Sequence, residues 1–249
     1  MLANTIILLN RLYLILSVFG ILSLGACKQD DSYAYDIEDI VGNSSDISIK
    51  ILSLGDSYTK GESVCNTCGF PFQLKNQLYN TIENVSIVEL EVIAETGWTT
   101  ANLLSAIESQ HPADNFDLVT LLIGVNNQYQ GLPFSQYEIQ FPQLVDEALQ
   151  RANNRADKVV VLSIPDYAYT PFGQSTSDPS EISDEIDAYN DFARSYAIQR
   201  NITFLDITDI TRMGLDEPTL VASDGLHPSE QAYTRFIERL LPIALEKIE

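Results

Sequence analysis

The hydrophobic positions of the chain follow two alternating patterns. Short apolar runs rich in β-branched residues predict buried strands, and longer stretches with apolar residues every three or four positions predict amphipathic helices. The predicted strands span residues 49–54, 85–94, 117–123, 158–164 and 202–207. The predicted helices span about residues 71–83, 99–108, 135–153, 181–200 and 228–247.

Strands that alternate with helices through five cycles predict a parallel sheet, because each parallel pair needs a crossover connection. Right-handed crossovers place helices on both faces of such a sheet. The expected fold is therefore a three-layer α/β/α sandwich with a five-stranded parallel sheet. The sequence shows no internal repeat, low-complexity tract or second domain, and we expect one folded domain over residues 48–249.

The first 26 residues form a separate segment that does not belong to the predicted fold. An uncharged apolar run from Leu12 to Ala26 follows Arg11 and is shorter than the ~20 residues that a membrane-spanning helix needs. Such a run before small residues is typical of a signal peptide. The Gly-Ala-Cys junction resembles a bacterial lipobox, so residues 1–26 are predicted to be a lipoprotein signal peptide and Cys27 the lipidated first residue. The alternative is an uncleaved anchor.

Residues 27–47 are acidic and polar, which predicts a solvated tether after the lipidated Cys27 and not a calcium site. The stretch from Lys28 to Asp31 resembles the acidic export tags that send some Gram-negative lipoproteins to the cell surface. We therefore expect an extracytoplasmic protein that is lipid-anchored to a bacterial membrane through Cys27, with exposure at the cell surface if the export tag operates.

The charge of the chain excludes one class of partner. The sequence has 14 basic and 35 acidic side chains, a formal net charge of −21, and no basic patch. Such a surface repels nucleic acid, so no nucleic-acid partner is expected. Solubility outside the cytoplasm is sufficient to account for the charge.

Two cysteines remain if Cys27 is lipidated, and they lie close together as Cys65 and Cys68. A neighbouring pair in an extracytoplasmic protein predicts a local disulfide. A zinc site would need four ligands, and the chain has two histidines and no second cysteine pair. A redox motif should open a helix directly after a strand, and Ser57 holds that position.

Three predicted strands end in turns at the sheet edge where open α/β folds bind ligands. These turns carry Ser57, Gly97 and Asn126, and a further polar pair, Asp224 and His227, precedes the last helix. Ester hydrolysis by serine needs a base, a partner that orients the base, and donors for the oxyanion. Each turn alone fits an ordinary strand–helix connection, but their common edge favours a catalytic site with Ser57 as nucleophile.

Histidine is the side chain suited to act as the base near neutral pH, and the chain offers two. His111 follows a predicted helix and precedes Pro112, so we interpret it as the end of that helix. His227 lies three residues after Asp224 and directly before Pro228, which fixes a helix start. This spacing lets Asp224 reach the imidazole, and the sequence therefore favours His227 as the base.

Four blocks of this sequence resemble those of the SGNH (GDSL-type) serine hydrolase family. In chain order they are Gly55-Asp56-Ser57-Tyr58-Thr59, Gly97, Gly124-Val125-Asn126-Asn127 and Asp224-Gly225-Leu226-His227-Pro228. Each block alone is a weak signal, but all four occur in order across residues 51–228. The resemblance implies an SGNH-hydrolase, flavodoxin-like fold.

The resemblance also implies a role for each matching residue. Ser57 would be the nucleophile, His227 the base and Asp224 its orienting partner. The oxyanion donors would be the backbone N–H groups of Ser57 and Gly97 and the side-chain amide of Asn126. No metal or cofactor is implied, and the α/β-hydrolase elbow, phosphate-loop and dinucleotide motifs are absent from the sequence.

The loop after the fourth strand often shapes the substrate pocket in this family, and here it contains Tyr167, Tyr169 and Phe172. We expect these rings and Asn127 to contact an acyl or sugar group, with loop packing as the other interpretation. The predicted function is a serine esterase that hydrolyses an acyl or acetyl ester of a glycan or lipid through an acyl-enzyme intermediate. The alternative is a cell-surface carbohydrate-binding lipoprotein with a silent hydrolase site.

Overall fold

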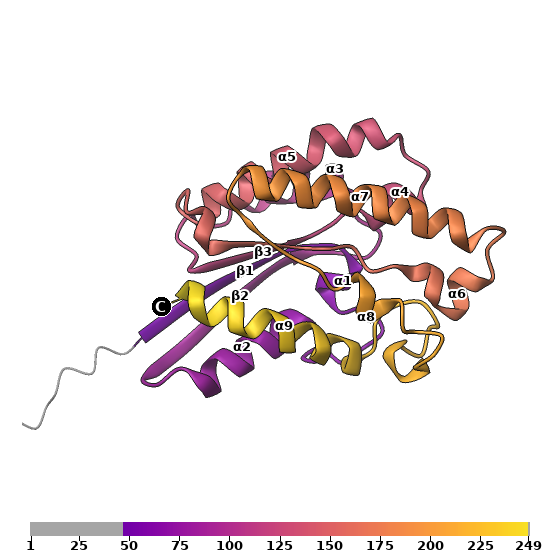
Figure 1. Cartoon of the computed structure of the whole chain (residues 1–249). Helices are drawn as coiled ribbons and strands as arrows, with labels where there is room; N and C mark the ends of the chain where they lie inside the picture. Colours follow the sequence, from indigo (N-terminus) through magenta and orange to yellow (C-terminus); the bar gives the residue numbers. More distant parts are fainter. Residues whose placement is uncertain (1–46, 249) are drawn as a thin grey trace, which may run out of the picture. The chain divides into compact units, whose positions relative to one another are not determined.

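Five strands form one parallel sheet in the order β2-β1-β3-β4-β5 (Figure 1). The computed structural model describes residues 47–248. The predicted signal peptide, most of the predicted tether and Cys27 lie outside the described residues. The strands are β1 (Ile47–Gly55), β2 (Val85–Ala94), β3 (Leu118–Leu122), β4 (Val159–Leu162) and β5 (Thr203–Leu205).

Helices of very different length connect the strands. The five long ones are α2 (Phe70–Thr81), α3 (Thr100–Gln110), α5 (Phe134–Arg151), α7 (Pro179–Gln199) and α9 (Glu230–Ile248). The short α-helices are α1 (Ser57–Lys60), α4 (Val125–Tyr129), α6 (Pro171–Gln174) and α8 (Thr208–Thr211). Three single 3₁₀ turns are η2 (Ala156–Lys158), η3 (Tyr167–Tyr169) and η4 (Pro218–Leu220).

The long helices cover the sheet on both faces (Figure 1). Helices α3, α5 and α7 lie together on one face, and α2 and α9 pack against each other on the opposite face. The predicted three-layer α/β/α sandwich with a five-stranded parallel sheet is confirmed. Among the described residues, no helix is long and apolar enough to cross a bilayer.

Burial explains why the strands read as nearly continuous apolar runs. Every residue of β3 and β4 is buried, because helices cover both faces of the sheet centre.

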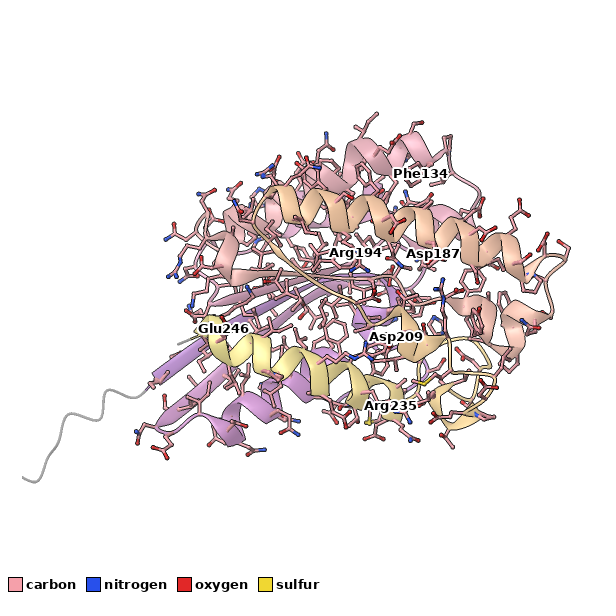
Figure 2. All side chains as sticks on the ribbon, viewed as in Figure 1. Phe134, Asp187, Arg194, Asp209, Arg235 and Glu246 are labelled. Carbon is pink, nitrogen blue, oxygen red and sulfur yellow. A yellow bond between two sulfur atoms is a disulfide. The ribbon has the colours of Figure 1, made fainter. Side chains whose placement is uncertain are left out.

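Two ion pairs connect α9 to the segment before it: Arg235 pairs with Glu217, and Arg239 pairs with Asp209. These ion pairs tie α9 to the segment that precedes the predicted acid–base pair, and Figure 2 shows Arg235 and Asp209 in this region.

The sheet register places three strand ends at one level. Gly55, the last residue of β1, pairs with Ala94 at the end of β2 and with Leu122 at the end of β3. Ser57, Gly97 and Asn126 follow these ends within four residues. The order of the sheet also reverses at β1, since the chain passes first to β2 and then across to β3. Such a switch point is where open α/β sheets bind ligands.

Most predicted element bounds agree with the structure to within one or two residues, and β2 is identical. Two stretches that lie between the predicted strands and helices contain short helices. The loop 165–179 forms η3 and α6, and the segment 208–223 forms α8 and η4. Single turns of this kind leave no periodic apolar pattern, because three or four residues cannot establish one.

Candidate active site

Ser57 stands at the junction between β1 and α1. Asp56 caps the short helix, because its carboxylate accepts the backbone N–H of Tyr58 at 3.0 Å. Gly55 is required before this turn, since a Cβ atom there would lie 2.4 Å from the carbonyl oxygen of Leu122. The turn therefore presents Ser57 at the carboxyl edge of the sheet, with 4% of its surface exposed.

Asp56 itself is fully buried beneath this turn. Burial raises the pKa of Asp56 to about 7, and hydrogen bonds from backbone N–H groups oppose that shift. Its second carboxyl oxygen, Oδ2, is buried without a hydrogen-bond partner among the described residues. The carboxyl group is thus poised to take up a proton near neutral pH.

Asp224 and His227 form a closely bonded pair in the segment before α9. Asp224 Oδ2 lies 2.6 Å from His227 Nδ1, and Asp224 Oδ1 accepts the backbone N–H groups of Leu226 at 2.9 Å and His227 at 3.0 Å. Ser63 Oγ also donates to Asp224 Oδ2, at 2.6 Å. Partial burial alone would raise the pKa of Asp224, but these hydrogen bonds outweigh it and hold the pKa well below its usual range.

The segment that carries this pair is folded back on itself. Val221 and Pro228 form an antiparallel bridge, and the backbone N–H of Ala222 donates to the His227 carbonyl at 2.7 Å. The imidazole of His227 packs edge-on against Tyr58, next to Ser57, with ring centroids 5.7 Å apart. Among the hydrogen bonds of residues 47–248, none joins Ser57 and His227. Catalytic contacts of this kind are often long in ligand-free enzymes.

Ser57 and His227 line one pocket of about 230 Å³. Gly97 and Asn126 line it as well, so the structure brings together four of the five residues named for catalysis, with Asp224 bonded behind His227. The other lining residues are Tyr58, Thr96, Val125, Tyr129, Tyr167, Phe172 and Leu226. The walls are mainly apolar.

The Gly97 loop and Asn126 contact each other at the pocket edge. Asn126 Nδ2 donates one hydrogen to the Trp98 carbonyl at 3.0 Å, which leaves the second amide hydrogen for a ligand. Gln130 Nε2 donates to the Gly97 carbonyl at 3.1 Å. Gly97 has a φ of +84°, a backbone conformation that glycine adopts readily. These hydrogen bonds hold the two peptide groups that directly follow the Gly97 N–H.

His111 lies away from this pocket. It ends α3 with a left-handed φ of 51°, whereas Gly97 precedes the start of the same helix. An 11-residue helix is ~16 Å long, so His111 stands at the opposite edge of the sheet. Its interpretation as a helix end is consistent with this position.

Two residues expected to contact substrate lie elsewhere. Asn127 is fully buried, and its amide accepts the Thr100 backbone N–H at 2.9 Å and donates to the Thr100 hydroxyl at 2.8 Å. Its hydrogen bonds therefore hold the start of α3, and its side chain does not line the pocket. Tyr169 points toward Arg212, whose guanidinium carbon is 6.0 Å from the ring centroid, and does not line the pocket.

Tyr167 and Phe172 line the pocket, as expected, and so does Tyr129, which the sequence analysis did not name. Tyr167, Phe172 and Tyr129 form a cluster with ring centroids 6.1–6.3 Å apart. Tyr129 is 57% exposed, at the mouth. No sequence pattern pointed to Tyr129, because α4 is a short helix whose direction depends on tertiary contacts.

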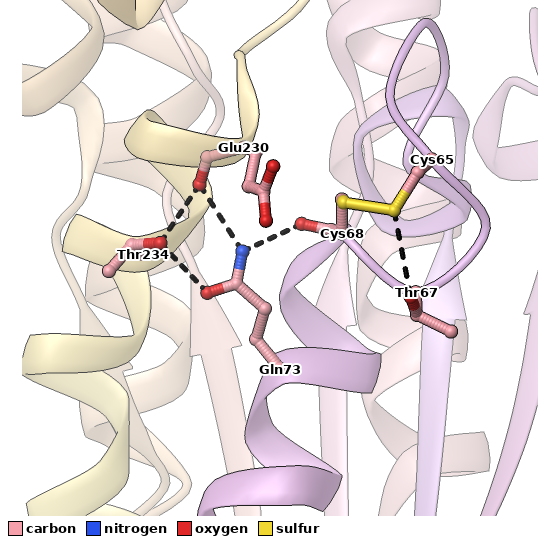
Figure 3. Close-up of a disulfide and its surroundings, with 6 residues drawn as sticks. All are labelled: Cys65, Thr67, Cys68, Gln73, Glu230 and Thr234. Atoms are coloured by element: carbon pink, nitrogen blue, oxygen red, sulfur yellow. Dashed lines mark hydrogen bonds between the residues drawn. A yellow bond between two sulfur atoms is a disulfide. The ribbon is translucent and has the colours of Figure 1, made fainter.

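Cys65 and Cys68 lie in the loop between α1 and α2, drawn as a disulfide with the Sγ atoms 2.09 Å apart (Figure 3). Gln73 Nε2 donates to the Cys68 carbonyl at 2.7 Å and to the Glu230 carbonyl at 3.2 Å, and Thr234 Oγ1 donates to Gln73 Oε1 at 3.0 Å. The loop is thereby joined to α9, the helix that follows His227.

Comparison with known proteins identifies the class. The model of the GDSL-like lipase/acylhydrolase family matches residues 53–235, which contain all of the pocket residues described above. The chain belongs to this family and is an SGNH (GDSL-type) hydrolase. No curated protein sequence matches it.

Several solved structures share the fold at low sequence identity. A member of the lipolytic G-D-S-L family from Veillonella parvula is 22% identical, with a TM-score of 0.58 over 80% of this chain and 97% of that one. An acetyl xylan esterase from Geobacillus stearothermophilus is 18% identical, with a TM-score of 0.58 over 79% and 94%. A lipase from a goat rumen metagenome is 18% identical, with a TM-score of 0.62 over 78% and 97%.

Proposed function

We propose that this hydrolase is a serine esterase that uses Ser57, His227 and Asp224 as its catalytic triad. The observation that carries the proposal is the 2.6 Å contact between Asp224 Oδ2 and His227 Nδ1, beside a pocket that Ser57 and His227 share. A carboxylate at Nδ1 holds the proton there and leaves Nε2 free to accept another. This is the state that a general base for a serine hydroxyl requires.

The reaction follows from these positions. Ser57 Oγ attacks the ester carbonyl carbon, and its proton passes to His227 Nε2. The negative charge that develops on the carbonyl oxygen is met by the backbone N–H groups of Ser57 and Gly97 and by the free amide hydrogen of Asn126. The tetrahedral intermediate collapses, and the departing alcohol takes the proton from His227. Water then hydrolyses the acyl-enzyme by the same steps, with His227 again as base.

The pocket walls indicate an ester with an apolar or ring-shaped group. Tyr129, Tyr167 and Phe172 offer aromatic faces suited to an acyl chain or to stacking on a sugar ring. A glycan ester or a lipid ester fits this description, and no observation favours carbohydrate binding with a silent site. Hydrolysis of an acetyl or longer acyl ester is therefore the activity to test.

Ser57→Ala is the primary experiment. This variant should lose hydrolysis of short-chain aryl esters and labelling by a fluorophosphonate probe, while its thermal melting stays close to that of the parent. Ser86→Ala, on the exposed part of β2, is the matched control and should keep both activities. Turnover retained by Ser57→Ala, or labelling of another residue, would refute the proposal.

The location of the protein is a separate proposal. Residues 1–26 would be removed as a signal peptide, and Cys27 would carry the lipid that anchors the mature chain outside the cytoplasm. Metabolic labelling with a fatty acid should mark the parent protein, whereas Cys27→Ala should lose the label and the membrane association. Protease treatment of intact cells would then report whether the anchored protein faces the cell surface.

A further inference from the structure

Ser63 lies outside the proposed triad but bonds directly to its acid. Its hydroxyl donates to Asp224 Oδ2 at 2.6 Å, and this is the same oxygen that contacts His227 Nδ1. The two residues are 161 positions apart in the chain, so this contact depends on tertiary structure. A hydrogen bond to a charged group contributes more than one between neutral groups.

The four donors around Asp224 divide between its two oxygens. Backbone N–H groups of Leu226 and His227 reach Oδ1, and the ring of His227 and the hydroxyl of Ser63 reach Oδ2. Ser63 is the one donor of this set that comes from outside the Asp224–His227 turn. Because χ2 of an aspartate is a broad torsion, a donor from outside the turn narrows the orientation of the carboxylate plane.

The backbone of Ser63 also has an unusual conformation. Its φ of +64° is in the left-handed region, where residues other than glycine are uncommon. Conformations of this kind persist where the surrounding structure holds them. Here Gly61 and Gly69 close the base of the loop, since a Cβ on Gly61 would lie 3.1 Å from the Gly69 Cα. The conformation directs the Ser63 side chain toward Asp224.

Further contacts hold this loop against the segment that carries His227. The Cys65–Cys68 pair lies two residues beyond Ser63, and Gln73 bridges the Cys68 and Glu230 carbonyls (Figure 3). The loop is therefore attached at two places to the C-terminal part of the chain, once through Gln73 and once through Ser63 itself.

We propose that Ser63 is a positioning residue of this enzyme, whose hydroxyl holds the Asp224 carboxylate in the plane that meets His227 Nδ1. The proposal rests on the proposed triad, because Ser63 acts only through Asp224. Ser63 does not line the pocket that Ser57 and His227 share. Its loss should affect the rate of the chemical step and leave substrate binding unchanged.

The central experiment compares Ser63→Ala, Asp224→Ala and the double variant. Ser63→Ala should lower kcat roughly 10- to 100-fold with KM unchanged, as expected for the loss of one hydrogen bond to a charged group. Asp224→Ala should lower kcat far more. Adding Ser63→Ala to Asp224→Ala should then have no further effect on kcat, because the group through which Ser63 acts is gone.

Two further variants separate the hydroxyl from the fold of the loop. Ser63→Gly removes the hydroxyl but accepts the left-handed backbone without strain, so it should show the same kcat as Ser63→Ala. Thr67→Ala removes an exposed hydroxyl from the same loop and should behave as the parent. Thermal melting of each variant shows whether it is folded.

The outcomes distinguish this inference from the function on which it rests. Full activity in Asp224→Ala would overturn the triad and the role of Ser63 together. Loss of activity in Asp224→Ala with parental kcat in Ser63→Ala would overturn the role of Ser63 alone. A Ser63→Ala effect that persists undiminished in the Asp224→Ala background would show that Ser63 serves the fold and not the carboxylate.

Discussion

Asp224 holds His227 by its main chain and its ring at once. Asp224 Oδ1 accepts the His227 backbone N–H at 3.0 Å, and Asp224 Oδ2 lies 2.6 Å from His227 Nδ1. Because both contacts arise within four consecutive residues, the proposed acid and base form one local unit. The turn itself therefore brings the imidazole and the carboxylate together, and Ser63 adds a contact from outside the turn to the same carboxylate.

Asp224→Asn tests this pair with little change in shape. The amide can still accept the backbone N–H groups, but its NH₂ group would face the ring nitrogen and favour the wrong tautomer. We expect kcat to fall by about 10⁴-fold while the melting temperature changes little. The control is Asp216→Asn, which makes the same change at an exposed aspartate eight residues before Asp224. A kcat within tenfold of the parent would contradict the assignment.

The acid limb of the pH profile follows from the same pair. Since hydrogen bonds hold the pKa of Asp224 well below its usual range, its carboxylate stays charged through the weakly acidic range in which a histidine base is generally protonated. The logarithm of kcat/KM should therefore fall with a slope of one as the pH is lowered, corresponding to a single proton. A slope of two would show that a second group titrates in the same range, and the profile of Asp56→Asn would tell Asp56 from Asp224.

Asn126→Ala should remove one of the proposed oxyanion donors. The expected loss in kcat is roughly 10²–10³-fold, with KM nearly unchanged, because the interaction strengthens only as charge develops. The same substitution also removes the hydrogen bond to the Trp98 carbonyl, so melting curves are needed beside the kinetics.

Gly97→Ala offers an independent test of the same proposed oxyanion site. Its Cβ would meet no protein atom within 4 Å, so a loss of rate would come from the strained backbone or from contact of the methyl group with the substrate.

Phe172→Ala should change the acyl preference of the enzyme. The ring forms part of the wall of the 230 Å³ pocket, and its removal enlarges the space beside Ser57. We expect kcat/KM to fall for short-chain esters and the preferred chain length to increase, measured over a series of aryl esters. Tyr169→Ala, in the same loop but outside the pocket, should keep the parental preference. Equal shifts in both variants would show a general loosening of the loop.

Asp56 should make stability depend on pH. Burial raises its pKa from 3.8 to about 7, so the folded protein binds a proton that the unfolded chain releases between these values. The resulting stabilisation is fully present below pH 4 and is lost as the pH rises through 7. Relative to Asp56→Asn, the parent should lose on the order of 3 kcal/mol between pH 5 and pH 8, measured by urea unfolding. Parallel pH profiles for the two proteins would contradict this expectation.

The Cys65–Cys68 disulfide remains a prediction for the exported protein. Intact mass after alkylation, with and without prior reduction, should show two thiols that react only after reduction. Cys65→Ser combined with Cys68→Ser should lower the free energy of unfolding by about 2 kcal/mol, since the bridge closes a very short loop. Two thiols that are alkylated without reduction would refute the bridge.

The sheet and the catalytic edge were predictable because they depend on local patterns. Buried strands of this type need apolar runs, and the turns that follow them need residues such as Gly55 and Ser57. Once the strands are parallel, their carboxyl ends must meet. Ser57, Gly97 and Asn126 could therefore be expected at one edge before their contacts were known.

Side-chain direction could not be predicted in the same way. Asn127 follows Asn126 directly, yet one lines the pocket and the other is buried against Thr100, because the turn of α4 separates their faces. Ser63 carries no sequence signal either. Its contact with Asp224 needs a left-handed backbone and a partner 161 residues away, and neither leaves a pattern in the chain.

The local character of the Asp224–His227 pair has a consequence for how the enzyme matures. Contacts between residues three positions apart form without the entropy cost of closing a long loop. Ser57, the proposed nucleophile, by contrast follows β1 at the start of the domain and meets His227 only when α9 has docked against α2. During synthesis, the nascent protein should therefore remain inactive until its last helix has left the ribosome and folded.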